Sequence, residues 1–442
     1  MKIELEPMQI IIYYKIELQV KIRIKIVIYI IVIKYFFGVW KMEDMINPFN
    51  PDSPVAPENF EGRKEILKSN IKILEQTKFG NPKHFFITGL RGMGKSSLAS
   101  YFKDYAEKKL KYVGVHIYND GVHDIDSLIK QIIESLLNNI QKESFFDKIF
   151  NKFKDHVESV NLFGTSFKFK PSENMLDYIK ENFAATLVGM LGNFDNKNGL
   201  VIIIDDINGL SNTPDFANWY KSFADTLATN YRNESPIIMA LVAYPEKLQM
   251  LHEHNPSFTR LFSHIELKGL LNKEISDFFT NAFNKMGMSV DEEAMKTMVK
   301  YSSGLPNMMQ EIGNGIFYMR NRDKNIITKD DAFSGVLFAG DVIGKKYLQP
   351  LLDSSIRSPQ YLDIFERIAK DVFSKNSNGE YFFRKKDFSE KLNDDEAKVF
   401  TDFLKRARKL KILEYYGPKK SGHYKFTNNL YPIYLAIQSL RK

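Results

Sequence analysis

The sequence of 442 residues contains no cysteine. This absence excludes disulfide bridges, thiolate metal sites and cysteine nucleophiles. Proteins that fold in a reducing cytosol have no need of disulfides, so the composition favours a cytoplasmic location. Hydrophobic residues make up 44% of the chain and charged residues 26%, which is ordinary for a globular protein. The length suggests two to four domains.

The chain also lacks long apolar runs. A membrane-spanning helix needs about 20 apolar residues, but the longest uncharged run in residues 1–41, from Ile26 to Ile33, has only eight, and Lys34 ends it. This Ile- and Lys-rich segment has no small-residue cleavage site typical of a signal peptide. Three interpretations stay open: an upstream extension outside the working chain, which would begin near Met42; a membrane-associated anchor; or an additional strand.

Patterns for several kinds of catalytic or metal site are missing as well. The histidines of the H-E-H stretch at residues 252–254 lie in a polar segment without a third ligand in view, so a metal site there is not favoured. No serine hydrolase pattern is apparent. The G-L-R-G stretch at residues 89–92 is no dinucleotide fingerprint, because a lysine and a serine come after it.

Positive charge is present and unevenly distributed. The formal net charge is +8, and residues 357–442 hold 19 Lys and Arg against 11 Asp and Glu. This segment alone carries an excess equal to the total. Such a basic terminal segment favours a polyanionic partner, although many solvated protein faces are also basic.

Apolar runs alternate with helical patterns through the first two thirds of the chain, and this alternation predicts a parallel α/β sheet. The predicted strands are residues 84–88, 112–118, 200–204, 236–244 and 264–270. The run at 200–204 has no polar interruption, as expected of a strand buried on both faces. We therefore expect an α/β core over residues 42–270.

The remainder of the chain divides into two further predicted parts. Residues 271–345 carry four helical patterns and predict a small helical domain. Residues 346–442 begin with helices and end with two short strands around a basic, glycine-containing turn. That order is typical of a winged helix-turn-helix.

The clearest motif comes directly after the first predicted strand and reads G-x-x-x-x-G-K-S. Small residues in such a turn allow main-chain amides to converge on phosphate oxygens, and the next helix adds its positive N-terminal end. Lysine is expected to reach the β- and γ-phosphates, and the first serine hydroxyl to ligate Mg²⁺. The predicted phosphate-binding residues are Gly89, Leu90, Arg91, Gly92, Met93, Gly94, Lys95, Ser96 and Ser97.

Two adjacent carboxylates end the predicted strand at 200–204. Because strand ends of a parallel sheet face one crevice, Asp205 and Asp206 are expected opposite the phosphate loop. Asp205 is the predicted Mg²⁺ ligand beside Ser96, and Asp206 is the predicted group that orients or deprotonates an attacking water. Capping or loop aspartates are the alternative.

With these motifs in place, the chain from about residue 47 resembles the AAA+/STAND group of P-loop ATPases, most of all proteins with an origin-recognition-complex-like ATPase domain. The stretch N-F-E-G-R-K-E-I resembles the family box in which Arg63 lies beside the nucleotide base. The stretch N-P-S-F-T-R resembles the segment of the arginine finger, which implies Arg260. The stretch S-S-G-L-P-N resembles the G-x-P signature, which places Pro306 against the nucleotide. The chain's end resembles the family's winged helix.

The chain also departs from the family pattern. The family usually has glutamate after the metal-binding aspartate, whereas Asp206 is one methylene shorter, which suggests slow hydrolysis. The strand at 236–244 offers no clear Asn, Ser or Thr to sense the γ-phosphate, and Asn307 stands where a sensor arginine is common.

Sequence and resemblance together imply an ATP- and Mg²⁺-dependent, slow ATPase that acts as a nucleotide switch. Two uses stay open. In one, the basic winged helix binds double-stranded DNA. In the other, the protein is a STAND-type signalling or defence ATPase whose winged helix contacts protein. An arginine finger from a neighbouring subunit implies an ATP-dependent homo-oligomer.

Overall fold

The described chain forms two compact units. The computed structural model describes residues 46–79, 83–119, 121–139, 157–159, 170–192, 194–231, 236–320, 324–356, 358–375, 382–417 and 422–441. We call residues 52–274 with 305–307 the core unit, and the described residues of 1–51, 275–304 and 308–442 the helical unit. The segments predicted as helical domain and winged helix fall mainly within the helical unit, and the threefold division stays a prediction.

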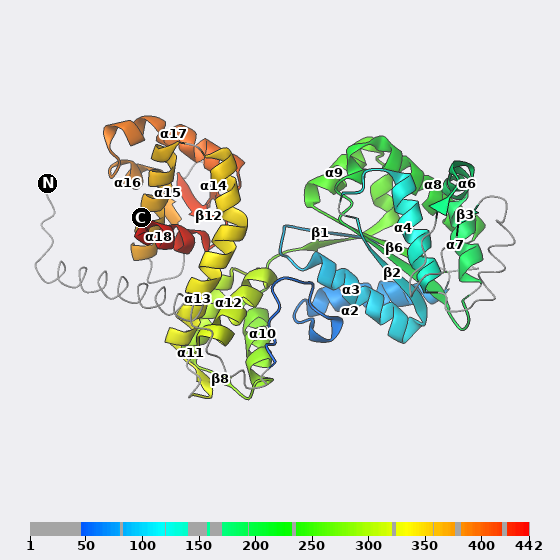
Figure 1. Cartoon of the computed structure of the whole chain (residues 1–442), viewed down its shortest axis with the longest axis horizontal. Coiled ribbons are helices and arrows are strands. Elements are labelled where there is room, and N and C mark those ends of the chain that lie inside the picture. The colour runs from blue at the N-terminus through cyan, green and yellow to red at the C-terminus, as the bar shows by residue number, and fades with distance from the viewer. Residues whose placement is uncertain are drawn as a thin grey trace, which may run out of the picture. The chain divides into compact units, whose positions relative to one another are not determined.

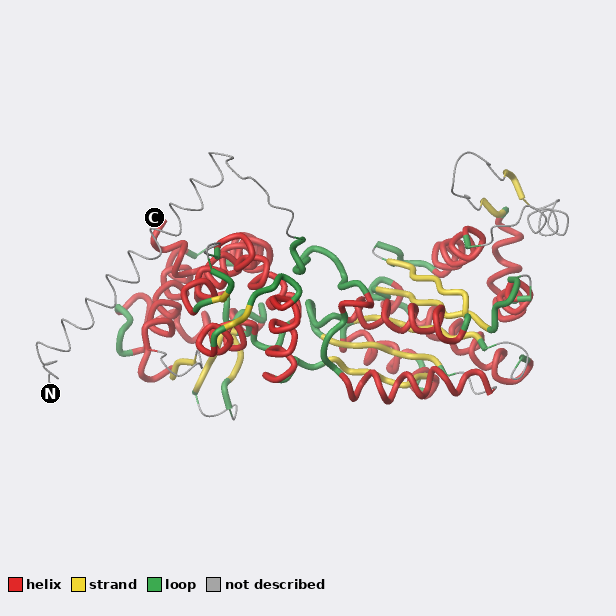
Figure 2. Tube along the Cα trace, turned by 90° about the horizontal axis from the view of Figure 1, so that it is seen from below, coloured by secondary structure: helices red, strands yellow, loops and turns green. Residues whose placement is uncertain are grey.

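A five-stranded sheet forms the centre of the core unit, with strand order β2-β5-β6-β1-β7 and every pairing parallel. All five strands occur where the sequence predicts them, which confirms the parallel α/β core. Figures 1 and 2 show them side by side between layers of helices. Their bounds are β1 His84–Gly89, β2 Tyr112–Tyr118, β5 Gly199–Asp205, β6 Ile237–Ala243 and β7 Phe262–Leu267.

Helices cover both faces of this sheet. Alternate residues of each strand point to opposite faces, so Val201 and Ile203 join one apolar cluster and Ile202 and Ile204 join the other. The first cluster includes α2 (Lys64–Gln76) and α3 (Lys95–Tyr105), and the second includes α4 (Ile125–Asn138), α6 (Glu173–Glu181), α7 (Phe183–Leu191) and α8 (Pro214–Asn230). The sheet is therefore buried on both sides, as its apolar strands require.

Shorter elements complete the core unit. They are η1 (Pro57–Asn59), η2 (Thr77–Phe79), η3 (Ala106–Leu110), β3 (Val157–Ser159), β4 (Lys170–Pro171), η4 (Leu210–Asn212), α9 (Pro245–His254) and η5 (Phe258–Leu261). Residues 173–191 form two helices, α6 and α7. They separate at Asn182, whose side-chain amide donates to the Tyr178 carbonyl.

The helical unit contains a larger group of helices. They are α10 (Asn272–Asn284, which begins in the core unit), α11 (Glu292–Ser302), α12 (Pro306–Met319, likewise), α13 (Lys329–Ile343), η6 (Gly344–Leu348), α14 (Gln349–Ser355), α15 (Pro359–Lys375) and α18 (Tyr431–Arg441). The short strands β8 (Ser289–Val290) and β9 (Ile326–Ile327) pair in parallel. Helix α18 packs against α13 and α15, and a Cβ at Gly344 would lie 1.9 Å from Tyr434. Only glycine allows this approach.

The last hundred residues also contain a three-stranded antiparallel sheet with order β10-β12-β11. Its strands are β10 (Phe382–Arg384), β11 (Leu413–Tyr415) and β12 (His423–Phe426), and helices α16 (Lys385–Ser389) and α17 (Asp394–Lys409) lie between β10 and β11 in sequence. The sequence predicts β11 and β12, but β10 is too short to be recognised from its three residues.

Among the described residues, no helix is both long and apolar enough to cross a bilayer. The segment of residues 1–41, with its three interpretations, lies outside them.

His84 is a fully buried titratable group in the sheet. It begins β1, its ring packs against Tyr220, Phe223 and Phe262, and its Nδ1 accepts a hydrogen bond of 3.0 Å from the Met239 main-chain amide. Burial lowers the pKa of His84 to about 4. The folded state therefore holds this imidazole neutral.

We expect this histidine to make stability depend on pH. Below its ordinary pKa of about 6.5 the unfolded chain binds a proton that the folded state refuses until pH approaches 4, so the free energy of unfolding falls as the pH drops through this window. Between pH 6.5 and pH 4, the titration of His84 lowers the free energy of unfolding by about 3 kcal/mol. His84→Asn keeps an acceptor for Met239 and does not titrate. Urea unfolding at pH 7 and pH 4.5 should show a smaller loss for this variant, and equal losses would contradict the expectation.

Candidate functional site

The predicted phosphate loop connects β1 to α3 in the core unit. Gly92 and Gly94 have φ of 79° and 81°, a left-handed conformation that favours glycine. Gly94 is the N-cap residue of α3 and has no side chain to cap the helix. The first main-chain amides of a helix have no partner within the helix, so those of α3 are suited to bind an anion. The loop therefore has the backbone that the motif predicts.

Lys95 is the first residue of α3 and is partly buried. Its Nζ donates to the Leu90 carbonyl at 3.2 Å and lies 4.7 Å from the centre of the Tyr244 ring. Burial lowers the pKa of Lys95, and the charges of Asp205 and Asp206 partly oppose that shift. The ammonium group is thus held inside the loop, close to both predicted carboxylates.

Asp205 and Asp206 lie at the carboxyl end of β5, between the ends of β2 and β6. Asp205 is 5% exposed, and its Oδ2 lies 3.1 Å from His116 Nε2. Asp206 has a φ of 64°, which is uncommon outside glycine and asparagine. Its Oδ1 accepts hydrogen bonds from the main-chain and side-chain amides of Asn208. The structure therefore brings both aspartates to the strand end predicted for them, each with a defined hydrogen-bond partner.

Four further residues of this region were missed from the sequence: Asn119, Asn208, Tyr244 and His116. The Asn119 main-chain amide donates to the Asp205 carbonyl at 2.8 Å. Asn208 Oδ1 accepts from the Tyr244 main-chain amide at 3.5 Å. Tyr244 comes directly after β6, where the sequence shows no Asn, Ser or Thr. The sequence signal that could have pointed to Tyr244 was a tyrosine at the end of β6, where the family pattern has Asn, Ser or Thr.

The two predicted Mg²⁺ ligands stand on neighbouring elements, because α3 packs against β5. The Ser97 hydroxyl is buried and accepts from the Val55 main-chain amide at 3.1 Å, so Ser96 is the better placed of the two loop serines to bind a metal ion. No group of three acidic or histidine side chains suited to a metal occurs among the described residues. One carboxylate and one hydroxyl fit Mg²⁺, which takes its other ligands from phosphates and water.

The Arg63 side chain supports the phosphate loop by donating hydrogen bonds to main-chain carbonyls. It is 7% exposed, and its two terminal nitrogens donate to the carbonyls of Met93 and Lys268, each at 2.9 Å. Burial lowers the pKa of Arg63, and Glu274 partly opposes the shift. The guanidinium group therefore links the loop to the segment after β7. Its expected place beside a nucleotide base stays a prediction.

The L-P-N stretch at residues 305–307 also contacts the phosphate loop. The Asn307 main-chain amide donates to the Gly92 carbonyl at 3.3 Å, and a Cβ at Gly92 would lie 2.4 Å from the Asn307 side chain. A Cβ at Gly94 would lie 3.8 Å from Pro306 Cγ. Asn307 Oδ1 is buried without a hydrogen-bond partner among the described residues. The structure thus places Pro306 beside the loop, together with a polar atom that has a free acceptor position, and the expected contact of Pro306 with the nucleotide stays a prediction.

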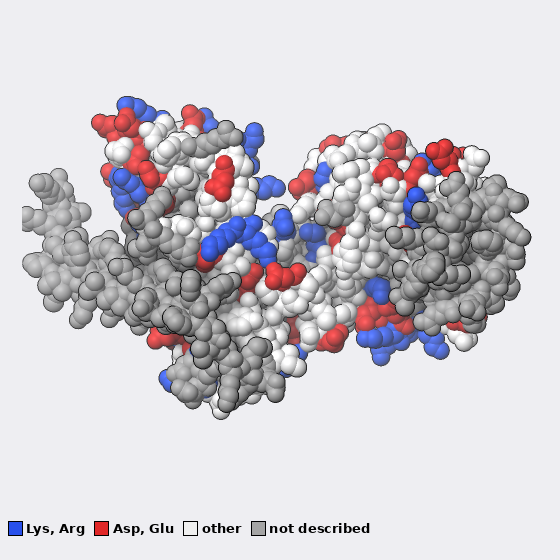
Figure 3. Space-filling view, viewed as in Figure 1, with Lys and Arg blue, Asp and Glu red and all other residues white. Residues whose placement is uncertain are grey.

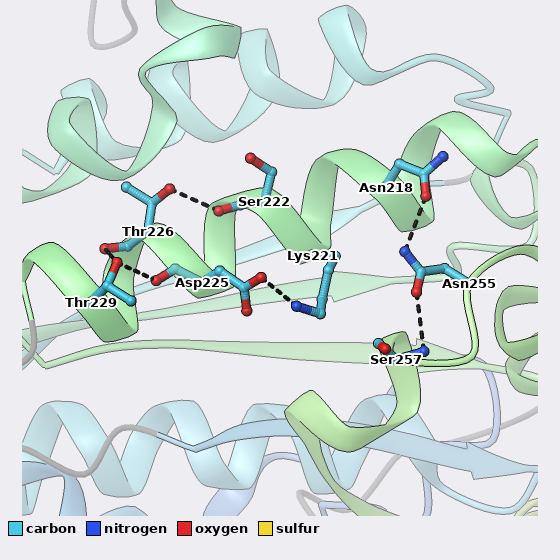
Figure 4. Close-up of polar contacts among 8 residues, drawn as sticks. All are labelled: Asn218, Lys221, Ser222, Asp225, Thr226, Thr229, Asn255 and Ser257. Atoms are coloured by element: carbon cyan, nitrogen blue, oxygen red, sulfur yellow. Dashed lines mark hydrogen bonds and ion pairs between the residues drawn. The ribbon is translucent and has the colours of Figure 1, made fainter.

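Arg260 is the outlying member of the predicted set. It lies in η5, and its side chain is exposed. The turn before it is anchored by Asn255, which accepts from the Ser257 main-chain amide at 3.1 Å and donates to Asn218 of α8 at 3.0 Å (Figure 4). Within the described part of the core unit, no hydrogen bond or ion pair connects Arg260 to the loop, so its role as an arginine finger stays a prediction.

Residues 63–214 match the model of the KAP family P-loop domain. No curated protein sequence matches the chain. The chain is similar in structure to the ORC2 protein of Aeropyrum pernix in its ADPNP–ADP complexes, with a TM-score of 0.52, 13% identity, and coverage of 88% of this chain and 96% of that chain. It is also similar to a Walker-type ATPase of Pyrococcus abyssi, with a TM-score of 0.49, 16% identity, and coverage of 89% and 100%.

The family match covers about a third of the chain and includes the phosphate loop, α3 and both aspartates. At 13% identity, the likeness to ORC2 concerns the fold. Together with the sheet order, these findings establish a P-loop NTPase domain of AAA+-like fold within the core unit.

Proposed function

We propose that the protein binds ATP with Mg²⁺ and hydrolyses it slowly as a nucleotide-dependent switch. The observation that carries this proposal is the packing of α3, which begins at Lys95, against β5, which ends at Asp205. The similarity in fold to an ORC2 protein that is complexed with ADPNP and ADP supports ATP as the nucleotide.

Each residue has a distinct part in this proposal. The loop amides and Lys95 hold the phosphates, and Ser96 and Asp205 hold the metal ion. Bound Mg²⁺ supplies positive charge that stabilises the phosphate oxygens. Asp206 orients the attacking water, and its short side chain, already hydrogen-bonded to Asn208, is consistent with slow turnover.

Calorimetry tests the binding step directly. Purified protein, freed of any nucleotide it carries, is titrated with ATP in the presence of Mg²⁺, and the same samples are melted with and without the nucleotide. We expect measurable heat and a higher melting temperature, because a ligand that binds only the folded state stabilises it. If millimolar ATP with Mg²⁺ produced no heat and did not raise the melting temperature, the proposal would be overturned.

The contact between Gly92 and Asn307 connects the loop to the start of α12, so a change in the loop can reach that helix. Residues 305–307 belong to the core unit, whereas α12 continues from Asn307 into the helical unit. A γ-phosphate bound by the loop would change the position of Gly92 and hence the start of α12. Nucleotide state then shifts the population of two packings.

Arg260 of a neighbouring copy completes the site in an ATP-dependent homo-oligomer. Measuring the molecular mass of the protein with and without MgATP tests this step.

For the last hundred residues, the proposed architecture is a winged helix. The order α15, β10, α16, α17, β11, β12 and the strand arrangement β10-β12-β11 support it. In this architecture α17 is the helix offered to the major groove of double-stranded DNA. The basic residues in the last turns of α17 separate into two pairs. Arg406 donates to the Ser355 carbonyl at 3.2 Å and Arg408 lies 4.3 Å from the Tyr415 ring, whereas Lys405 and Lys409 are exposed.

A second function, protein contact in a STAND-type switch, is favoured by the charges on α17. Lys405 lies 3.0 Å from Asp402, and Lys398 lies 2.9 Å from Asp395. Figure 3 likewise shows Lys and Arg interspersed with Asp and Glu over this part of the molecule. Mixed charge weakens attraction to phosphate. Lys419 and Lys420 lie outside the described residues.

A binding assay with a short DNA duplex separates the two functions. If DNA is the partner, Lys405→Gln with Lys409→Gln should weaken binding about tenfold and reduce the slope of log affinity against log salt by roughly 2. The control is Lys296→Gln with Lys345→Gln, which removes the same charge from α11 and η6. Duplex binding that is absent, or equally weakened in both double variants, would favour protein contact.

A further inference from the structure

A buried chain of hydrogen bonds connects three elements of the core unit behind the predicted metal ligand. Ser100 lies on α3, His116 on β2 and Asp205 at the end of β5. Ser100 Oγ is 3.2 Å from His116 Nδ1, and His116 Nε2 is 3.1 Å from Asp205 Oδ2. The side chains of His116 and Asp205 are only 8% and 7% exposed. The three residues therefore form a continuous, partly buried polar chain that joins α3, β2 and β5.

The chemistry of the groups fixes the direction of this chain. An ionised carboxylate only accepts hydrogen bonds, so Nε2 of His116 donates to Asp205. In the tautomer with its proton on Nε2, Nδ1 is an acceptor and takes a hydrogen bond from the Ser100 hydroxyl. The Tyr118 ring stacks on the imidazole, with 4.3 Å between the ring centres and 16° between the planes. Ser100 and Tyr118 together hold the ring in one orientation.

In this arrangement one carboxylate oxygen of Asp205 is hydrogen-bonded to His116, and the other stays available for a ligand. Oδ2 points to His116, and no hydrogen bond to Oδ1 occurs among the described residues. A carboxylate whose one oxygen is fixed from behind has its rotamer set before a ligand arrives. Hydrogen-bonded partners behind metal ligands orient those ligands and often change metal affinity 10- to 100-fold.

We propose that His116 is a positioning residue that orients Asp205 toward Mg²⁺, and that Ser100 sets the orientation of His116. This inference rests on the proposed function. Ser100 is one helical turn beyond Ser96, so α3 supplies both a metal ligand and, one turn later, the end of the hydrogen-bond chain that aligns the second ligand. The loop and the strand end are thereby matched to each other.

Packing alone is the competing explanation, since a buried carboxylate needs a donor whatever its role. The two explanations differ in what His116 affects. A purely structural histidine stabilises the core unit and changes nucleotide affinity equally with and without Mg²⁺. A positioning histidine affects the part of the affinity that Mg²⁺ adds.

The test measures ADP binding by wild type and three variants, once in EDTA and once with saturating Mg²⁺. His116→Leu removes the donor to Asp205, His116→Gln keeps an N–H near the position of Nε2, and Ser100→Ala removes only the end of the chain. We expect His116→Leu to bind ADP in EDTA within about twofold of wild type, and to lose about 10- to 100-fold of the gain from Mg²⁺. His116→Gln should recover most of it, and Ser100→Ala should lose less than His116→Leu.

Each other outcome is decisive. An unchanged Mg²⁺ gain in His116→Leu, or an equal loss in EDTA and in Mg²⁺, would overturn the inference and leave nucleotide binding intact. If His116→Leu does not fold, Ser100→Ala decides in the same way, because it deletes a hydroxyl without reaching the carboxylate. Wild type that binds no ADP in either buffer would overturn the proposed function itself.

Discussion

Replacing Lys95 by methionine should weaken ATP binding roughly 100-fold or more. The ammonium group lies inside the phosphate loop, at 3.2 Å from the Leu90 carbonyl. It is partly buried, and this burial lowers its pKa. A hydrogen bond between charged groups contributes about 1.5–3 kcal/mol, and two such bonds to phosphate oxygens account for the expected loss.

Methionine preserves most of the length of the side chain and removes the ammonium group, so the loop should keep its shape. The control is Lys221→Met on α8, which removes an equal charge where the lysine pairs with Asp225 (Figure 4). Calorimetry should give wild-type affinity for the control. ATP affinity of Lys95→Met within threefold of the control would show that the loop does not grip the phosphates as proposed.

Replacing Asp206 by asparagine should leave ATP binding nearly unchanged and reduce the rate of hydrolysis at least about 100-fold, the range typical of a lost general base or water-orienting group. Asparagine suits this position for two reasons. Asp206 has a φ of 64°, and asparagine tolerates this region well, whereas alanine would add backbone strain. The asparagine carbonyl also keeps an acceptor for the Asn208 amide.

The measurement is phosphate release under single turnover, beside ATP affinity by calorimetry. Asp225→Asn, at an exposed carboxylate of α8, is the matched control and should turn over as wild type does. Wild-type turnover by Asp206→Asn would refute the catalytic role of Asp206. Loss of binding instead of turnover would indicate that this carboxylate serves the nucleotide or metal ion, with Asp205.

Much of the fold is encoded in patterns between neighbouring residues. An apolar run such as residues 200–204 predicts a buried strand because every second side chain must enter an apolar layer on each face. The glycines, lysine and serine after β1 predict a phosphate loop because their spacing alone determines which amides converge. Asp205 and Asp206 could be placed opposite that loop because parallel strands end at the same edge.

Contacts between distant strands were not predictable in this way. His116 reaches Asp205 across 89 residues because β2 and β5 are neighbours in the sheet, and no local pattern encodes that order. Asn307 contacts Gly92 through a segment that returns to the core unit after α10 and α11. The same limit applied to β10, a strand of three residues whose partner β12 lies far along the chain.

The sequence by itself determined a parallel α/β core, and it placed a glycine-rich loop with lysine and serine and a pair of carboxylates at strand ends, all through spacing within short segments. Only the tertiary structure decided which groups surround them. Arg63 supports the Met93 carbonyl, Asn307 covers Gly92 and His116 stands behind Asp205. The physical reason is that hydrogen bonds act over about 3 Å, and strand order and helix packing bring residues to that distance irrespective of their separation along the chain.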